Sequence, residues 1–178
     1  MTQIKRSSSG GSSGSPSSDS AGNSEQGTVM TWWLRLAPLP AGRLLFSSAL
    51  GWLAPYSSSI GARVEEIRPG YARVSIKDRR RLRNHLHSMH AIALINLGEL
   101  TTGLAVLSTI SQNMRGIVLD IHADYLKKAR GKLTAVAEFQ LPQPLLEDTR
   151  CEVEARLQDQ SGETVTRVRA TWLIGYKT

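Results

Sequence analysis

An apolar run at positions 91–107, preceded by a polar, histidine-rich approach, constrains the fold more than any other part of the chain. The run contains no proline and only one charged residue, Glu99, so it predicts a long helix. Ser88 is the expected N-cap, because serine side chains accept hydrogen bonds from free helix N–H groups. Apolar residues lie around most of the helix circumference, which predicts that the helix is covered on nearly all sides.

Three polar residues interrupt this apolar helix. Asn96, Glu99 and Thr102 are each three positions apart and therefore form a stripe along one side. A carboxylate in apolar surroundings is costly unless it is paired, protonated or functional. Two interpretations of Glu99 follow: a catalytic carboxylate, or a buried acid satisfied by Asn96, Thr102 or a basic partner at a subunit interface.

The rest of the ordered chain alternates between apolar and polar residues with a period of two, which is typical of half-buried strands. An Arg68-Pro69-Gly70 turn joins the first two strands in a hairpin. Two strands, one helix and four further strands predict an α+β fold, with an antiparallel sheet of about six strands wrapped around one long central helix. The expected strands cover residues 60–68, 71–77, 117–126, 133–139, 150–158 and 164–176.

The residues before this domain fall into two parts. Residues 1–28 are rich in serine and glycine and nearly free of apolar side chains, so we expect a disordered tail. For residues 29–56 we expect an N-terminal helical segment with one or two short helices, the last of which ends before Pro55, and the domain itself spans 57–178. Positions 30–55 either cover the sheet or the core, or form a lid or a peripheral membrane contact.

The net charge and the composition limit the classes of binding partner that we expect for this chain. A net charge of +7 favours a polyanion: nucleic acid, an acidic membrane surface or a phosphorylated small molecule. Aromatic residues make up only 6% of the chain and none lies in the arginine loop 79–83, which argues against nucleic acid.

Location is inferred from what the chain lacks. No apolar run is long enough to span a bilayer, and the N-terminus has no signal-peptide pattern. The single cysteine, Cys151, lies in an alternating strand pattern and is interpreted as a small buried hydrophobe in a reducing compartment. A soluble, cytoplasmic protein is expected.

A histidine cluster suggests one alternative chemistry. His85, His87 and His90 follow the spacing His-x-His-x-x-His, close to a metal-ligand run of metallo-hydrolases. Met89 occupies the position where those enzymes have an aspartate, and His122 is the only other histidine. A metallo-hydrolase is therefore the less favoured alternative, and no metal or cofactor is expected.

Asn84, His90 and Glu99 match a known signature, Asn-x-x-Gly-x-x-His-Gly-Gly followed along the helix by an acid. The chain therefore resembles the hotdog-fold thioesterases, specifically the PaaI-like acyl-CoA thioesterases and the DUF4442 branch, over residues 53–176. His87 replaces the first glycine of the signature, and Ala91 and Ile92 replace the glycine pair.

The resemblance implies hydrolysis of a fatty or aryl acyl-CoA, with coenzyme A present only as part of the substrate. Glu99 would activate water or attack the carbonyl, and backbone N–H groups near His90 and Ala91 would form an oxyanion hole. A non-catalytic acyl-CoA binding protein is the main alternative. The remaining catalytic candidates are Asn84 and Thr102, and the substrate-binding candidates are His87, Asn96 and the basic residues Arg81, Arg83, Lys127, Lys128 and Arg130, whose charges suit phosphates.

Helix geometry adds a prediction about assembly. At about 100° and 1.5 Å per residue, His90 and Glu99 lie on opposite sides of one helix, with a rise of about 13 Å between them. If both serve one site, a second chain supplies one of them. We therefore expect a homodimer or a dimer of dimers with equivalent sites at the subunit interface.

Overall fold

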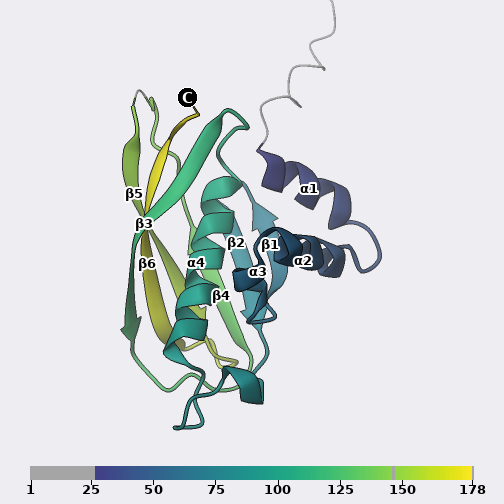
Figure 1. Cartoon of the computed structure of the whole chain (residues 1–178), viewed down its shortest axis with the longest axis vertical. Helices are drawn as coiled ribbons and strands as arrows, with labels where there is room; N and C mark the ends of the chain where they lie inside the picture. The colour runs from purple at the N-terminus through teal and green to yellow at the C-terminus, as the bar shows by residue number, and fades with distance from the viewer. Residues whose placement is uncertain (1–26, 146, 178) are drawn as a thin grey trace, which may run out of the picture.

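The computed structural model describes residues 27–145 and 147–177, and nearly all of the predicted tail, residues 1–28, lies outside these ranges. The described chain forms one antiparallel sheet with one central helix against it and three short helices at its side (Figure 1). The predicted fold class is confirmed. None of the described helices is long and apolar enough to cross a membrane.

The sheet has six strands in the order β1-β2-β4-β5-β6-β3. The alternation of apolar and polar residues predicted the bounds of most strands to within a few residues, because one face of each strand is buried. Ala72, Val74 and Ile76 of β2 are at most 1% exposed. Cys151 of β5 is likewise buried, and burial raises the pKa of its thiol. The strands are β1 (Arg63–Arg68), β2 (Tyr71–Ile76), β3 (Met114–Tyr125), β4 (Leu133–Glu138), β5 (Thr149–Gln158) and β6 (Thr164–Tyr176).

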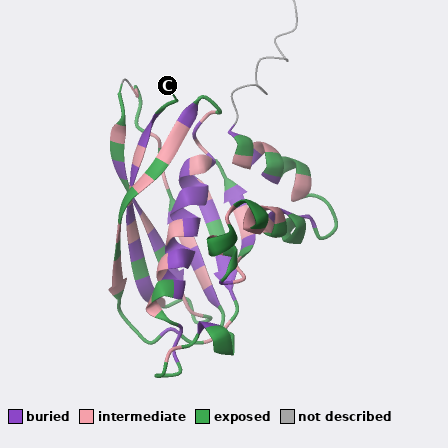
Figure 2. Cartoon of the chain, viewed as in Figure 1, coloured by how far each residue is buried: buried purple, intermediate pink, exposed green. Residues whose placement is uncertain are grey.

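The apolar run forms α4 (Ala91–Leu107), a helix of 17 residues that contacts all six strands. Figure 2 shows that most of α4 is buried, as its all-round hydrophobicity predicted. The helix approaches β6 closely at Gly98, where an added Cβ would lie 2.3 Å from the Cβ of Val168. A larger residue at this position would push the helix away from the sheet.

Strand β3 lies at one edge of the sheet and, among the described strands, pairs only with β6. The uniform alternation predicted for this strand is wrong, because a bulge between Val118 and Asp120 shifts the register. Val118 and Ile121, on either side of the bulge, both pack against the core, whereas Ile117 and Leu119 are nearly half exposed.

The opposite edge, β1, is covered by the N-terminal helices α1 (Thr28–Leu36) and α2 (Gly42–Leu53), and α3 (Pro55–Ser58) packs against α2 and α4. The Val64 N–H of β1 donates to Ser47 Oγ of α2 at 3.0 Å, so a side chain satisfies part of the free edge. The second helix ends before Pro55, as predicted, but a short third helix that was not predicted starts at this proline, because a first-turn residue needs no N–H donor.

Candidate functional site

The N-cap of helix α4 is His90, not the predicted Ser88. His90 has an extended backbone, and its Nδ1 accepts a hydrogen bond from the Ile92 N–H at 3.2 Å. The Ser88 side chain is buried and donates to the carbonyl of Ala129 at 3.0 Å. Histidine therefore takes the capping role that the sequence assigned to serine.

One backbone donor is left free at this helix start. The N–H of Ala93 donates to the His90 carbonyl and that of Ile92 to the His90 ring, but the Ala91 N–H has no acceptor within the described part of the chain. Ala91 is half-buried and lies at the positive end of the α4 dipole. A free N–H in this position is suited to an anionic oxygen.

The preceding loop is shaped by Asn84. Its Oδ1 accepts from the N–H groups of Leu86 (2.9 Å) and Ser88 (3.2 Å), and its own N–H donates to the Ser88 carbonyl at 2.8 Å. These bonds close a tight loop between residues 84 and 88. The geometry thus makes Asn84 a loop-forming residue whose oxygen is already occupied.

His87, which replaces a signature glycine, lies in this loop with φ of 53°. A positive φ is the left-handed conformation that glycine adopts most easily. The loop therefore keeps the backbone shape that glycine would give, although its side chain is now an exposed imidazole.

Glu99 lies nine residues along α4 from the cap and is half-buried. Burial raises the pKa of its carboxyl above the ordinary value. Among the residues that the structure describes, no hydrogen bond or ion pair reaches the carboxylate. Within the described part of the chain, Glu99 is thus a partly desolvated acid without a neutralising partner.

The two residues expected to hold this carboxylate are engaged elsewhere. Thr102 Oγ1 donates to the backbone carbonyl of Glu99 at 3.0 Å and accepts from Trp172 Nε1 at 3.3 Å. Asn96 Nδ2 donates to the Tyr56 carbonyl of α3 at 3.2 Å. Asn96 Oδ1 is buried and has no partner among the described residues. The structure therefore disfavours the interpretation of Glu99 as an acid satisfied by its helix neighbours.

The two predicted basic segments meet beside the start of α4. The Met89 N–H donates to the Ala129 carbonyl at 2.8 Å, and Asp78 joins the loops by accepting from Arg83 Nε (2.7 Å) and the Gly131 N–H (3.0 Å). The hydrogen bond from Arg83 holds the pKa of Asp78 below its usual range, so the acid stays ionised. The sequence did not show that the two loops are neighbours.

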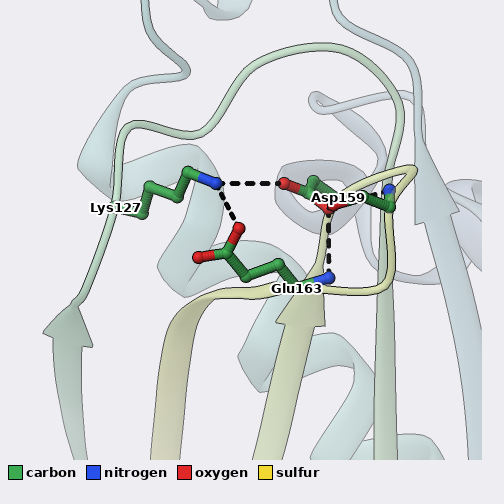
Figure 3. Close-up of polar contacts among 4 residues, drawn as sticks. Lys127, Asp159 and Glu163 are labelled. Atoms are coloured by element: carbon green, nitrogen blue, oxygen red, sulfur yellow. Dashed lines mark hydrogen bonds and ion pairs between the residues drawn. The ribbon is translucent and has the colours of Figure 1, made fainter.

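These basic residues are not equivalent. Arg83 is paired with Asp78, and Lys127 forms ion pairs with Glu163 and Asp159 (Figure 3). Their charges are thus largely balanced within the chain. The other three candidates are exposed and have no acidic partner in residues 27–145 and 147–177: Arg81, Lys128 and Arg130.

The described residues contain no group of three or more His, Cys, Asp and Glu side chains arranged to hold a metal. His85, His87 and His90 are all exposed. His122 lies on β3, where its Nε2 is 3.2 Å from Asp124 Oδ1.

Sequence reasoning missed Tyr125, at the end of β3. Its hydroxyl donates to the carbonyl of Ala91 at 3.4 Å, so it lies at the helix start, and burial raises its pKa. No sequence signal identifies this contact, because it depends on how β3 passes α4.

The membrane contact predicted for residues 30–55 stays a prediction, although Trp52 in this segment is 83% exposed.

The chain matches the model of one protein family, the domain of unknown function DUF4442, over residues 42–174. A structural-genomics protein superposes with a TM-score of 0.72 at 30% identity, covering 84% of this chain and 98% of that one. A Pseudomonas aeruginosa protein of unknown function, described as a probable thioesterase, has a TM-score of 0.62 at 24% identity, covering 69% and 88%. A Haemophilus influenzae thioesterase has a TM-score of 0.62 at 18% identity, covering 71% and 88%.

No curated protein matches the chain. At identities below 25%, the likeness to the two bacterial thioesterase structures bears on the fold and not on the activity. The family match spans well over half of the chain and includes α4 with its whole approach. The chain therefore belongs to the DUF4442 family and has the hotdog fold.

Proposed function

We propose that this protein hydrolyses the thioester of an acyl-CoA. The observation that carries the proposal is the half-buried Glu99, whose carboxylate has a raised pKa and no partner among the described residues. Raised carboxyl pKa values bring an acid toward the range in which it works as a base near neutral pH. A purely structural acid at this position would be expected to have a hydrogen-bonded or charged partner.

The chemistry requires a base and an oxyanion donor. Glu99 takes a proton from water as the water oxygen attacks the thioester carbonyl, and the free Ala91 N–H stabilises the negative oxygen of the tetrahedral intermediate. Collapse of this intermediate breaks the C–S bond, and the thiolate takes up the proton. The products are the carboxylic acid and coenzyme A, and no metal or further cofactor enters the reaction.

Within one chain, the helix start at His90 and the Glu99 carboxylate do not meet in one site. His90 caps α4, and Glu99 lies nine residues further along the same helix, on its opposite side. We propose that a second copy completes each site. The free edge of β3, with Ile117 48% and Leu119 46% exposed, offers the surface for a symmetric pair. Light scattering on the purified protein tests this, and a strictly monomeric species at assay concentrations would contradict it.

The activity test measures thiol release from acyl-CoAs of short, medium and long chains and from an aryl acyl-CoA. Glu99→Gln is expected to reduce kcat by at least about a hundredfold, the order of magnitude of lost general-base catalysis. Glu152→Gln is a matched control, because Glu152 is an exposed acid of β5.

Retained turnover in the Glu99 variant would refute the catalytic role. Saturable binding of acyl-CoA by wild type without any turnover would instead identify an acyl-CoA binding protein. This second outcome would have a structural explanation. Ala91 and Ile92 occupy the positions of the signature glycine pair, and glycines allow a closer approach to the backbone than residues with side chains.

A further inference from the structure

A cavity of about 460 Å³ lies between the helices α2 and α3 and the strands β1 and β2, and no residue of α4 lines it. This volume falls within the range of small-molecule sites. The register pairs Arg63 with Ser75. Ser75 and Lys77 alternate with Val74 and Ile76, which face the core, so their side chains lie on the sheet surface opposite α4.

The charged lining is strongly unbalanced. Four cations, Arg63, Lys77, Arg79 and Lys132, line the cavity together with one acid, Glu65. The helical wall adds no compensating charge, because residues 27–64 contain no aspartate or glutamate.

Glu65 is already engaged. Its carboxylate lies 2.8 Å from Lys132 Nζ and 3.2 Å from Arg73 Nε. Burial alone would raise its pKa, but hydrogen bonds from Lys132 and Ser75 hold the pKa below its usual range. Glu65 therefore neutralises Lys132 and has no charge left for the other three cations.

Asp78 lies between the cavity residues Lys77 and Arg79 in the sequence, but its carboxylate pairs with neither of them. Its two oxygens accept from Arg83 and from the Gly131 N–H. Within the described residues, Arg63, Lys77 and Arg79 thus have no acidic partner. Three uncompensated cations around one cavity repel one another unless an anion is present.

Two arginines converge at Gly61, on the cavity wall. A Cβ placed on Gly61 would lie 2.8 Å from Arg79 Nη1 and 3.4 Å from Arg81 Nη2. Both nitrogens therefore lie close to one point, although they carry the same charge. Gly61 has φ of 65° and no side chain, which allows both guanidinium groups this approach.

We propose that this cavity is a binding site for a phosphate-bearing ligand. Arginine forks match phosphate oxygens, and two or three negative charges balance the three free cations. Ser48, an exposed hydroxyl of α2, offers an additional donor in the wall. The observations that support this site do not involve Glu99 or thioester hydrolysis. Its ligand is either a phosphate group of coenzyme A or a separate phosphorylated molecule.

Calorimetry with inorganic pyrophosphate tests the site directly, without any enzymatic readout. Wild type is expected to bind saturably, with an affinity that falls as salt is added. Arg79→Ala and Lys77→Ala are each expected to weaken binding by at least about tenfold, the loss typical of one charge-assisted hydrogen bond.

Two further variants make the binding test specific. Arg80→Ala is the matched control, because Arg80 is exposed in the same loop but does not line the cavity. Ser48→Glu places a negative charge in the wall and is expected to abolish binding without removing any cation. Circular dichroism confirms that each variant is folded.

A competition experiment distinguishes the two sources of phosphate. If coenzyme A displaces pyrophosphate, and Arg79→Ala weakens binding of coenzyme A but not of pantetheine, the cavity holds the phosphates of coenzyme A. If coenzyme A leaves pyrophosphate bound, the ligand is a separate molecule. Absence of saturable pyrophosphate binding by wild type at millimolar concentration, or wild-type affinity in Arg79→Ala and Lys77→Ala, would overturn the proposal.

Discussion

Replacing Glu99 by glutamine is expected to stabilise the fold at neutral pH while removing the activity. Burial raises the carboxyl pKa in the folded state, so the folded protein holds this proton more tightly than the unfolded chain. The stabilising effect of the protonated form is complete well below pH 4.5, the ordinary value of the group, and is lost as pH rises through the folded-state pKa. Glutamine has nearly the same shape and carries no charge at any pH.

The size of the effect follows from the cost of desolvating a polar group that has no hydrogen-bond partner. In protein mutational data this cost is roughly 1–3 kcal/mol. Solvent reaches this half-buried side chain, and screening reduces that figure. We expect Glu99→Gln to raise the free energy of unfolding at pH 7 by on the order of 1 kcal/mol, and to leave it nearly unchanged at pH 3.

Urea denaturation of both proteins across this pH range measures the difference. The free energies of wild type and variant should diverge as the pH rises and become parallel above the folded-state pKa. Glu152→Gln, with its exposed carboxylate, should show no such divergence. A Glu99→Gln variant that is less stable than wild type at pH 7 would refute the reasoning, since it would show that the carboxylate has a stabilising partner.

Two further predictions concern backbone positions around the site. Gly98→Ala should lower the free energy of unfolding by about 2 kcal/mol, because overpacking against Val168 exceeds the gain of about 1 kcal/mol in helix propensity. Gly103→Ala is its control in urea denaturation: the nearest atom, of Trp172, would be 3.1 Å away, and equal stabilities of the two variants would contradict the close-approach explanation. His87→Gly should raise the urea midpoint by relieving the positive φ, with a net gain of about 0.5–1 kcal/mol after the entropy cost of glycine, and a fall in the midpoint would show that the imidazole makes stabilising contacts.

Much of the fold was predictable because burial on one side imposes a period on each element. The alternation in residues 164–176 marked β6 with its observed bounds, and the inward faces of β2 and β5 were identified correctly. The prediction failed in β3, because a bulge changes which side a residue faces without changing its composition. It also failed at the helix start, where His90 caps α4 because Ser88 is drawn into a contact with Ala129.

The sequence by itself determined the central helix and the acid within it, because these depend on local periodicity and spacing. Only the tertiary structure decided how the described residues pair: the Glu99 carboxylate has no partner among them, the two basic loops meet through Asp78, and three cations remain unbalanced around the cavity beside α2. The reason is physical. Charge balance and hydrogen bonding depend on which distant side chains come within a few ångströms of one another, and the pairing of β1, β2 and β4 brings together residues more than 60 positions apart, such as Glu65 and Lys132.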